Sequence, residues 1–385
     1  MVYCIPYILL LVFYGILSVY RYNNDEDEDI KRKVDVLCVL AFIFFFGLRG
    51  FVYDDWINYY PAFQRCSFDN VSLNIFEYNN EWVYEPGFTL LMCVCKAIVD
   101  DYQFLVFVTT TINALLLYNF FRNRIGNLPI GFILFICFGG LGMSTNLMRN
   151  SIAIMIFVNA LTYIKERKPL PYFGLCLLAI SFHVSAIAYF PLYFLFNRKC
   201  NKWVYLGLFV VSNLIFILRI PVFLSFVSMV LGDSEGRIQT MIGIYTSGNF
   251  DEMKTLSIGY LERLFTGILI FCYYEKLAGI RDENKMFINA FICYFLMTFV
   301  LSEFGTISLR MSYLFMFAYW ILWYDLVKCF AIESNRKLFL GFMFIYLSLK
   351  TVGLSNLITA EYDNVLFGIK TYEERLYIHN RYATE

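Results

Sequence analysis

Charged side chains are scarce in this sequence. Only 16% of the 385 residues are Asp, Glu, Lys or Arg, whereas a soluble domain carries about 25%. Hydrophobic residues make up 59% of the chain, and long apolar runs recur from one end to the other. A soluble core cannot absorb so many apolar runs, so the sequence predicts an all-α, polytopic integral membrane protein.

Metal ligands and net charge are scarce as well. The chain has only two His, and Cys93 and Cys95 have no second Cys pair to complete a metal site. Most of the 11 Cys lie inside apolar runs, where Cys acts as a small apolar packing residue. The 31 basic and 31 acidic side chains cancel, so the net charge by itself implies no polyanionic partner. We therefore expect no metal, no other cofactor and no nucleic acid.

The apolar runs predict roughly 10 to 12 membrane spans in one domain over residues 1–385. The candidate spans are residues 2–20, 34–48, 102–121, 128–144, 147–164, 203–218, 257–274, 286–302, 311–327 and 338–357. Two further segments are ambiguous. Segment 86–99 is short for a span, and segment 170–196 is long, with a proline near each end and His183 between them. Segment 170–196 is therefore either one tilted helix or two short helices that turn at His183.

Basic residues in the short loops predict the orientation, because such loops face the cytoplasm. The basic loops are residues 21–33, 122–124, 165–168, 198–202, 276–285 and 328–337. All of them face the cytoplasm if 86–99 does not cross and 170–196 forms a hairpin with His183 near its outer tip. The segments that then face outward are the N-terminus and the loops 49–85, 219–256 and 303–310. We expect the first two of these loops to form part of an outward-facing cavity.

The titratable residues left on the outward side share one depth, at or just beneath the membrane surface. They are Arg49, Asp54, Asp55, Glu85, Arg149, His183, Glu262, Arg263 and Arg310. Anchoring at a helix end explains any single one of them, because a long side chain snorkels to the interface. Anchoring arginines, however, belong mainly on the cytoplasmic side. The joint pattern therefore favours an outward-facing polar cavity lined with arginines.

Arginine presents a planar, permanently charged fork of donors that suits phosphate or carboxylate. Several arginines in one cavity indicate a polyanionic group, and a lipid-carried diphosphate fits both the charge and the depth. Two interpretations of His183 remain open: a general base for a hydroxyl group, or a histidine satisfied by a neighbouring carbonyl at a helix break. Asp54, Asp55 and Glu85 either pair with the arginines or orient a sugar hydroxyl.

Five motifs occur in order over about residues 40 to 320: LRGFVYDDWINYYPAF, EPGF at 85–88, NLMRNSIAIMIF, SFHVSAIAYFPLY and LRMSYLF. Together they resemble the EpsG family of bacterial exopolysaccharide and capsule synthesis, which is similar to the Wzy-type O-antigen polymerases. The family's usual RQ pair is Arg149–Asn150 here. The arginine is retained, and the amide that follows it is changed.

The resemblance implies a GT-C-like helical fold in the bacterial inner membrane, with the active site facing the periplasm or the outside. It implies a metal-independent glycosyltransferase that moves a growing glycan from undecaprenyl diphosphate to the non-reducing end of another lipid-linked repeat unit. The implied diphosphate ligands are Arg149, Arg310, Arg263 and Arg49, and the implied catalytic residues are His183, Asp54, Asp55 and Glu85. The implied partners are the undecaprenyl-diphosphate-linked oligosaccharide, membrane lipid and a chain-length regulator protein.

Other classes share part of this pattern. An O-antigen ligase-like transferase would use the same donor, and an acyltransferase would decorate outer sugars. A flippase for lipid-linked oligosaccharides is the non-enzyme alternative, and a membrane scaffold is the simplest one. A flippase needs charges along a central path at both depths, so charges on one face favour the polymerase.

Overall fold

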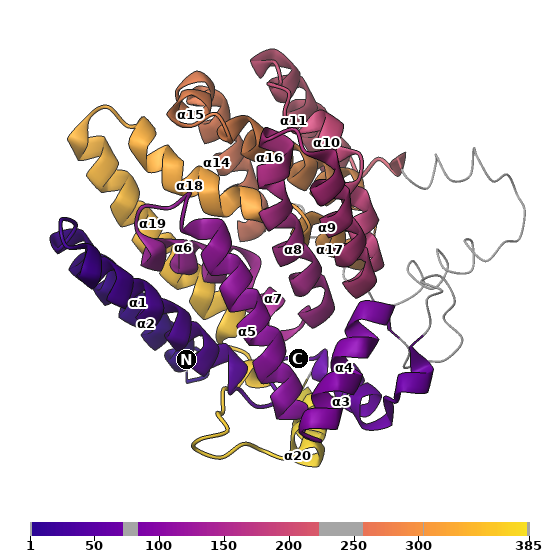
Figure 1. Ribbon diagram of the computed structural model, residues 1–385. Coiled ribbons are helices and arrows are strands. Elements are labelled where there is room, and N and C mark those ends of the chain that lie inside the picture. The colour runs from indigo at the N-terminus through magenta and orange to yellow at the C-terminus, as the bar shows by residue number, and fades with distance from the viewer. Residues whose placement is uncertain (1, 72–83, 223–256, 303, 383–385) are drawn as a thin grey trace, which may run out of the picture. The chain divides into compact units, whose positions relative to one another are not determined.

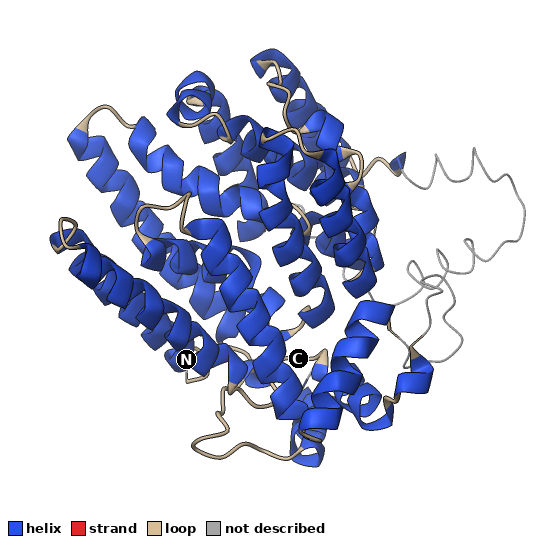
Figure 2. Cartoon of the chain, in the orientation of Figure 1, coloured by secondary structure: helices blue, strands red, loops and turns tan. Residues whose placement is uncertain are grey.

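The computed structural model describes residues 2–71, 84–222, 257–302 and 304–382. Within these residues the chain is built of helices and connecting loops, with two isolated β-bridges and no strand (Figures 1 and 2). The predicted all-α class is confirmed. Packing divides the chain into two compact units: unit 1 is Met1–Tyr193 with Ile332–Glu385, and unit 2 is Phe194–Ala331. The single domain over 1–385 stays a prediction, and most of the predicted cavity loop 219–256 lies outside the described residues.

Unit 1 contains both ends of the chain and most of the predicted site residues. Its helices are α1 (Ile5–Asn23), α2 (Glu28–Phe42), η1 (Ile43–Gly47), α3 (Trp56–Arg65), η2 (Phe68–Asn70), α4 (Pro86–Ile98), α5 (Tyr102–Phe121), α6 (Leu128–Phe135), η3 (Ile136–Gly140), α7 (Leu141–Thr145), α8 (Met148–Lys165), α9 (Pro169–Phe182), η4 (Val184–Tyr189), α19 (Glu333–Ser355), η5 (Ile358–Ala360) and α20 (Tyr372–Tyr382). The short helix α10 (Leu192–Leu195) includes residues of both units. Side-chain caps begin several of these helices; the Asp101 carboxylate, for example, accepts a hydrogen bond from the Gln103 N–H at the start of α5.

Among the described residues, four helices are long and apolar enough to cross a membrane. They are Ile5–Asn23, Tyr102–Phe121, Leu128–Thr145 and Glu333–Ser355. Further apolar helices are shorter: Pro86–Ile98, Pro169–Phe182, Val184–Leu195, Lys202–Ile217 and Asn284–Val300. The chain is therefore a multi-pass membrane protein, while the total of 10 to 12 spans stays a prediction.

Segment 170–196 bends at His183, as the two-helix alternative predicts. Helix α9 ends just before His183, whose backbone is extended (φ −156°, ψ 123°), and the 3₁₀ helix η4 follows. The Tyr172 hydroxyl donates to the Tyr189 carbonyl at 2.6 Å, which holds the returning segment against α9. The alternative of one tilted helix over this segment is wrong.

The helix over Leu128–Thr145 is bent at Gly139, whose φ of 86° is a left-handed conformation that suits glycine. A second break follows at Asn146 and Leu147, and α8 begins at Met148. Arg149 is therefore the second residue of α8. Most of α8 is buried within unit 1, so this arginine begins a helix at the centre of the unit rather than one that faces lipid.

Unit 2 is a separate helical bundle. It contains α11 (Lys202–Ile217), α14 (Ile258–Cys272), α15 (Tyr274–Ile280), α16 (Asn284–Val300), α17 (Gly305–Tyr313) and α18 (Phe317–Cys329). The predicted span 311–327 is wrong as a continuous helix, because α17 ends at Tyr313 and α18 begins at Phe317. Helix α17 packs back on α16, where the Ser308 hydroxyl donates to the Thr298 carbonyl at 2.9 Å. Arg310 thus lies on a short helix, and residues 305–310 are not a loop.

Candidate functional site

A buried ion pair joins the first residues of α4 and α8. Glu85 is the N-cap residue of α4, and its carboxylate accepts a hydrogen bond from Nη1 of Arg149. The Glu85 side chain is 2% exposed and that of Arg149 is 17% exposed. A cation near a helix N-terminus opposes the helix dipole, whereas a carboxylate there complements it. The Glu85 carboxylate therefore offsets the unfavourable position of the guanidinium.

The same carboxylate reaches a third segment. The other oxygen of Glu85 accepts a hydrogen bond from the Val184 N–H at 3.1 Å, in the turn that follows His183. Glu85 therefore ties the start of α4 to the start of α8 and to the bend after α9. Both of its oxygens therefore accept hydrogen bonds within the protein.

Two tyrosine rings enclose the guanidinium of Arg149. Its central carbon lies 4.1 Å from the ring centroid of Tyr84 and 5.9 Å from that of Tyr59. The Nε of Arg149 also donates to the Tyr59 hydroxyl at 3.4 Å. Burial raises the pKa of Tyr84 above its usual value, so this ring stays neutral at ordinary pH. These cation–π contacts hold the guanidinium plane in one orientation.

The guanidinium of Arg149 has further N–H donors that no described protein group accepts. A guanidinium carries five N–H donors, and the protein contacts of Arg149 engage only Nε and Nη1. In the part of the chain that the structure describes, Nη2 has no hydrogen-bond partner. The result is an oriented, partly exposed guanidinium whose remaining edge can bind an oxygen of an anionic ligand.

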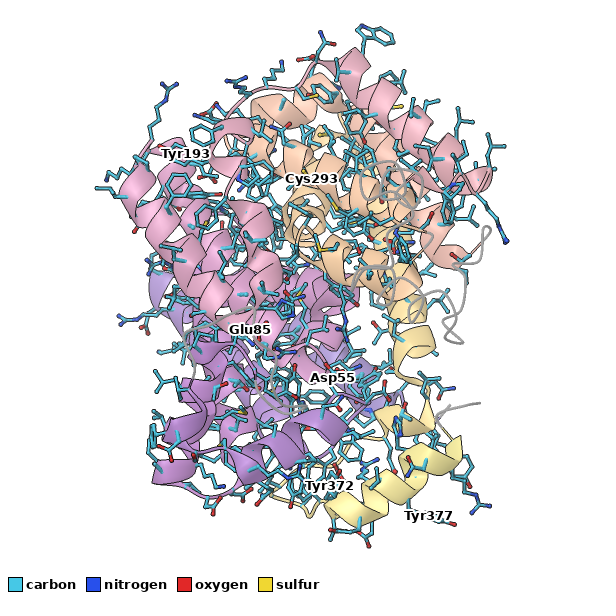
Figure 3. All side chains as sticks on the ribbon, turned by 90° about the vertical axis from the view of Figure 1, so that its right-hand side faces the viewer. Asp55, Glu85, Tyr193, Cys293, Tyr372 and Tyr377 are labelled. Atoms are coloured by element: carbon cyan, nitrogen blue, oxygen red, sulfur yellow. The ribbon has the colours of Figure 1, made fainter. Side chains whose placement is uncertain are left out.

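Asn146 brings the loop of Asp54 and Asp55 close to the Glu85–Arg149 ion pair. Its side-chain oxygen accepts hydrogen bonds from the backbone N–H groups of Asp54, at 3.1 Å, and Asp55, at 3.5 Å. The Asp55 carbonyl accepts from the Tyr59 N–H at 3.1 Å, at the start of α3. Asn146 comes three residues before Arg149, so these contacts bring the Asp54–Asp55 loop close to the start of α8. Figure 3 shows Asp55 and Glu85 in the same region of unit 1.

His183 stands at the helix break itself. Its Nδ1 accepts a hydrogen bond from the Ser185 N–H at 3.2 Å and lies 2.7 Å from the Ser185 hydroxyl oxygen. Because a backbone N–H always donates, Nδ1 is an acceptor, and a neutral ring then carries its proton on Nε2. This arrangement favours the structural interpretation of His183, and its role as a general base stays a prediction.

Arg49 has a structural position. It is 2% exposed, and its guanidinium donates to the Ser144 carbonyl at 3.0 and 3.2 Å and to the Thr145 carbonyl at 3.2 Å. A third carbonyl, that of Gly50, accepts at 3.4 Å. These contacts cap the carbonyl end of α7, where a cation is favourable. The predicted diphosphate-binding role of Arg49 stays a prediction that these contacts do not favour.

We expect Arg49→Ala to reduce the stability of unit 1. The buried Ser144 and Thr145 carbonyls would lose charge-assisted hydrogen bonds, at a cost of about 1.5–3 kcal/mol. Thermal unfolding of the purified protein in detergent measures the loss, and Arg49→Lys should recover part of it. A variant of unchanged stability that no longer binds an anionic lipid would instead support the predicted ligand role.

The other two predicted arginines lie in unit 2. Arg263 is partly buried on α14, and its Nε donates to the Tyr294 hydroxyl at 2.9 Å, next to the buried Glu262. Arg310 is exposed on α17. The structure thus brings Arg149, Glu85, Asp54, Asp55 and His183 together in unit 1, and it places Arg263 and Arg310 in the other unit.

Two polar residues near the pair carry weaker sequence signals. Asn146 stands in the NLMRN motif, although only the arginine of that motif has an obvious chemistry. His379 is one of the two His of the chain, and its Nε2 lies 3.3 Å from the Asp54 carboxylate. Hydropathy does not indicate a role for His379, because this residue follows the last apolar run of the chain. Among the described residues there is no group of three or more His, Cys, Asp or Glu that could hold a metal ion.

The fold and the site define a multi-pass helical membrane protein with an oriented arginine among broken helix ends. The model of the EpsG family matches residues 33–362, and the chain therefore belongs to the EpsG family. This confirms the resemblance of the five motifs. The family is one of membrane proteins of polysaccharide biosynthesis. No curated protein and no solved structure matches the chain.

Proposed function

We propose that this protein is a polysaccharide polymerase of the Wzy type in the bacterial inner membrane, with its site facing outward. It transfers a growing glycan from undecaprenyl diphosphate to the non-reducing end of another lipid-linked repeat unit. The observation that carries the proposal is the Arg149 guanidinium, which Glu85, Tyr59 and Tyr84 orient while its Nη2 edge remains available. Membership of a polysaccharide-biosynthesis family supports it.

In this reaction the acceptor hydroxyl oxygen forms a bond to the anomeric carbon of the donor glycan. The bond between that carbon and the diphosphate oxygen breaks, and the electron pair leaves with the diphosphate. Negative charge therefore grows on the leaving oxygens, where the free edge of Arg149 stabilises it. Because Glu85 and the two tyrosines already fix the guanidinium, little reorganisation is needed at that moment.

The acceptor hydroxyl must also lose its proton to a base. Asp54 and Asp55 are the carboxylates that the Asn146 contacts bring to the start of α8. The Asp54 side chain is 51% exposed, so it is open to a sugar arriving from the aqueous side. Glu85 is less suited to this role, because both of its oxygens already accept hydrogen bonds inside the protein. We therefore assign acceptor orientation and proton removal to the Asp54–Asp55 loop.

Reconstitution tests the proposal directly. The purified protein is placed in lipid vesicles with a synthetic undecaprenyl-diphosphate repeat unit, and the size distribution of lipid-linked glycan is measured. A ladder of products supports the polymerase. Transfer of one complete chain to an unrelated acceptor would support the ligase-like alternative. Movement of intact substrate across the bilayer without growth would support the flippase.

A further inference from the structure

The chain continues beyond the part that the family match covers. The match ends at residue 362, whereas residues 358–382 fold back onto the loop and helix at 48–60. Figure 1 shows α20 at the same end of unit 1 as α3 and α4. This C-terminal segment therefore belongs to the neighbourhood of the Asp54–Asp55 loop, although most of it is not part of the matched family region.

Backbone hydrogen bonds connect the two segments at several points. The Gly50 N–H donates to the Asp363 carbonyl at 3.1 Å, and the Tyr53 N–H donates to the Thr359 carbonyl at 2.8 Å. In the opposite sense, the Val365 N–H donates to the Leu48 carbonyl at 2.8 Å. The fit at Gly50 is tight, because a Cβ there would lie 2.1 Å from an Asp363 carboxylate oxygen.

Arg375 anchors α20 to the segment that makes these bonds. It is 2% exposed, and its guanidinium donates to the Glu361 carbonyl at 2.7 Å and to the Glu361 carboxylate at 3.2 Å. It also lies 3.0 Å from the carboxylate of Asp363. One buried guanidinium thus holds Asp363, whose carbonyl accepts the Gly50 N–H, together with nearby Glu361.

Side chains of α20 then reach α3 and the site loop. The Tyr372 ring stacks on that of Tyr60 with centroids 4.4 Å apart, and it meets the Trp56 ring edge-on at 5.4 Å. About two helical turns further along α20, His379 Nε2 lies 3.3 Å from the Asp54 carboxylate. Asp54 therefore has its side-chain partner on α20, 325 residues later in the chain.

We propose that residues 358–382 form a strap that fixes residues 48–60, which comprise the Asp54–Asp55 loop and the start of α3. We propose further that His379 is a positioning residue that holds the Asp54 carboxylate for the acceptor sugar. The strap follows from the backbone contacts alone. The role toward the acceptor rests on the proposed function. Helix α20 lies beyond the residues that the family match covers.

Hydrogen exchange tests the strap without any activity assay. In Arg375→Ala we expect the Gly50 and Tyr53 amides to exchange about tenfold faster or more, because their acceptors lose their anchor. Tyr377→Ala is the matched control, since Tyr377 lies on the same helix and is 63% exposed. Figure 3 shows Tyr372 and Tyr377 on α20. Unchanged exchange at both amides in a folded Arg375→Ala protein would overturn the strap.

An assay in which donor and acceptor are different molecules tests His379. The acceptor is a repeat-unit glycan on a short alkyl chain, which cannot act as a donor because it lacks the diphosphate. For His379→Ala we expect kcat/KM for this acceptor to fall about tenfold, with the donor KM unchanged. His379→Gln, which retains a hydrogen-bond donor, should recover part of the loss. The Asp54→Asn, His379→Ala double variant should be no worse than Asp54→Asn alone.

The positioning role would be overturned if the losses from Asp54→Asn and His379→Ala multiplied in the double variant. It would also be overturned if His379→Ala raised the donor KM by the same factor by which it lowered kcat/KM for the acceptor. If the unmodified protein builds no glycan at all, the proposed polymerase fails, but the hydrogen-exchange arm still decides whether the strap exists. The two failures are therefore distinguishable.

Discussion

Arg149→Ala should abolish glycan growth in the reconstituted system while the protein remains in the membrane. Removing one pre-oriented donor that faces developing negative charge costs about 10²–10³-fold in kcat, and here the lost group is a full charge. The measurement is the rate of ladder formation per folded molecule. That normalisation matters because the substitution also removes the partner of the buried Glu85 carboxylate.

Two further variants sharpen this result. Arg149→Lys keeps the charge and a contact to Glu85 but loses the planar fork, so we expect a large partial loss rather than recovery. Lys165→Ala is the matched control, because it removes an exposed cation from the opposite end of α8. A normal ladder of glycan products from Arg149→Ala would show that Arg149 does not bind the leaving diphosphate.

Glu85→Ala should have the largest effect on stability. It leaves the guanidinium of Arg149, which is largely buried, without its counter-charge, and breaking a buried pair in this way costs about 3–5 kcal/mol. It also removes the acceptor for the Val184 N–H. Thermal unfolding in detergent should show a much lower midpoint, and the yield of folded protein should fall.

The companion variants separate charge from packing. Glu85→Gln retains an acceptor for Val184 and nearly the same shape, so it should lose less stability than Glu85→Ala. Replacing both Glu85 and Arg149 with Met should recover much of the stability, because no buried charge is left unpaired. That double variant should still build no glycan. If Glu85→Ala unfolds like the unmodified protein, the ion pair does not hold these helix ends together.

The sequence predicted the helical membrane class well, since long apolar runs have few other solutions. It also predicted the spans 102–121 and 128–144 to within a residue or two of the observed helices. It failed within 303–327, where hydropathy cannot distinguish one long helix from a short helix that folds back and a second one that follows. The turn at His183 was one of two open alternatives, because a proline at each end of the segment marks its boundaries but not its bend.

For the site, the residue types were visible in the sequence and their partnerships were not. An arginine at the start of an apolar helix signals a special position because it opposes the helix dipole. The sequence grouped Arg49 with Arg149, since the predicted topology places both at outward helix ends. Only the structure shows that Arg49 caps α7 inside the protein while Arg149 keeps an available edge.

What the sequence determined by itself was that this chain folds in a membrane, which follows from composition and from local runs of apolar residues. The side of the membrane on which its charged residues lie stays a prediction. Tertiary structure decided which charges meet. Glu85 and Arg149 are 64 residues apart, and Asp54 and His379 lie near opposite ends of the chain. Contacts over such separations depend on where helices break and pack, because hydropathy measures how apolar a segment is and not which segment it faces.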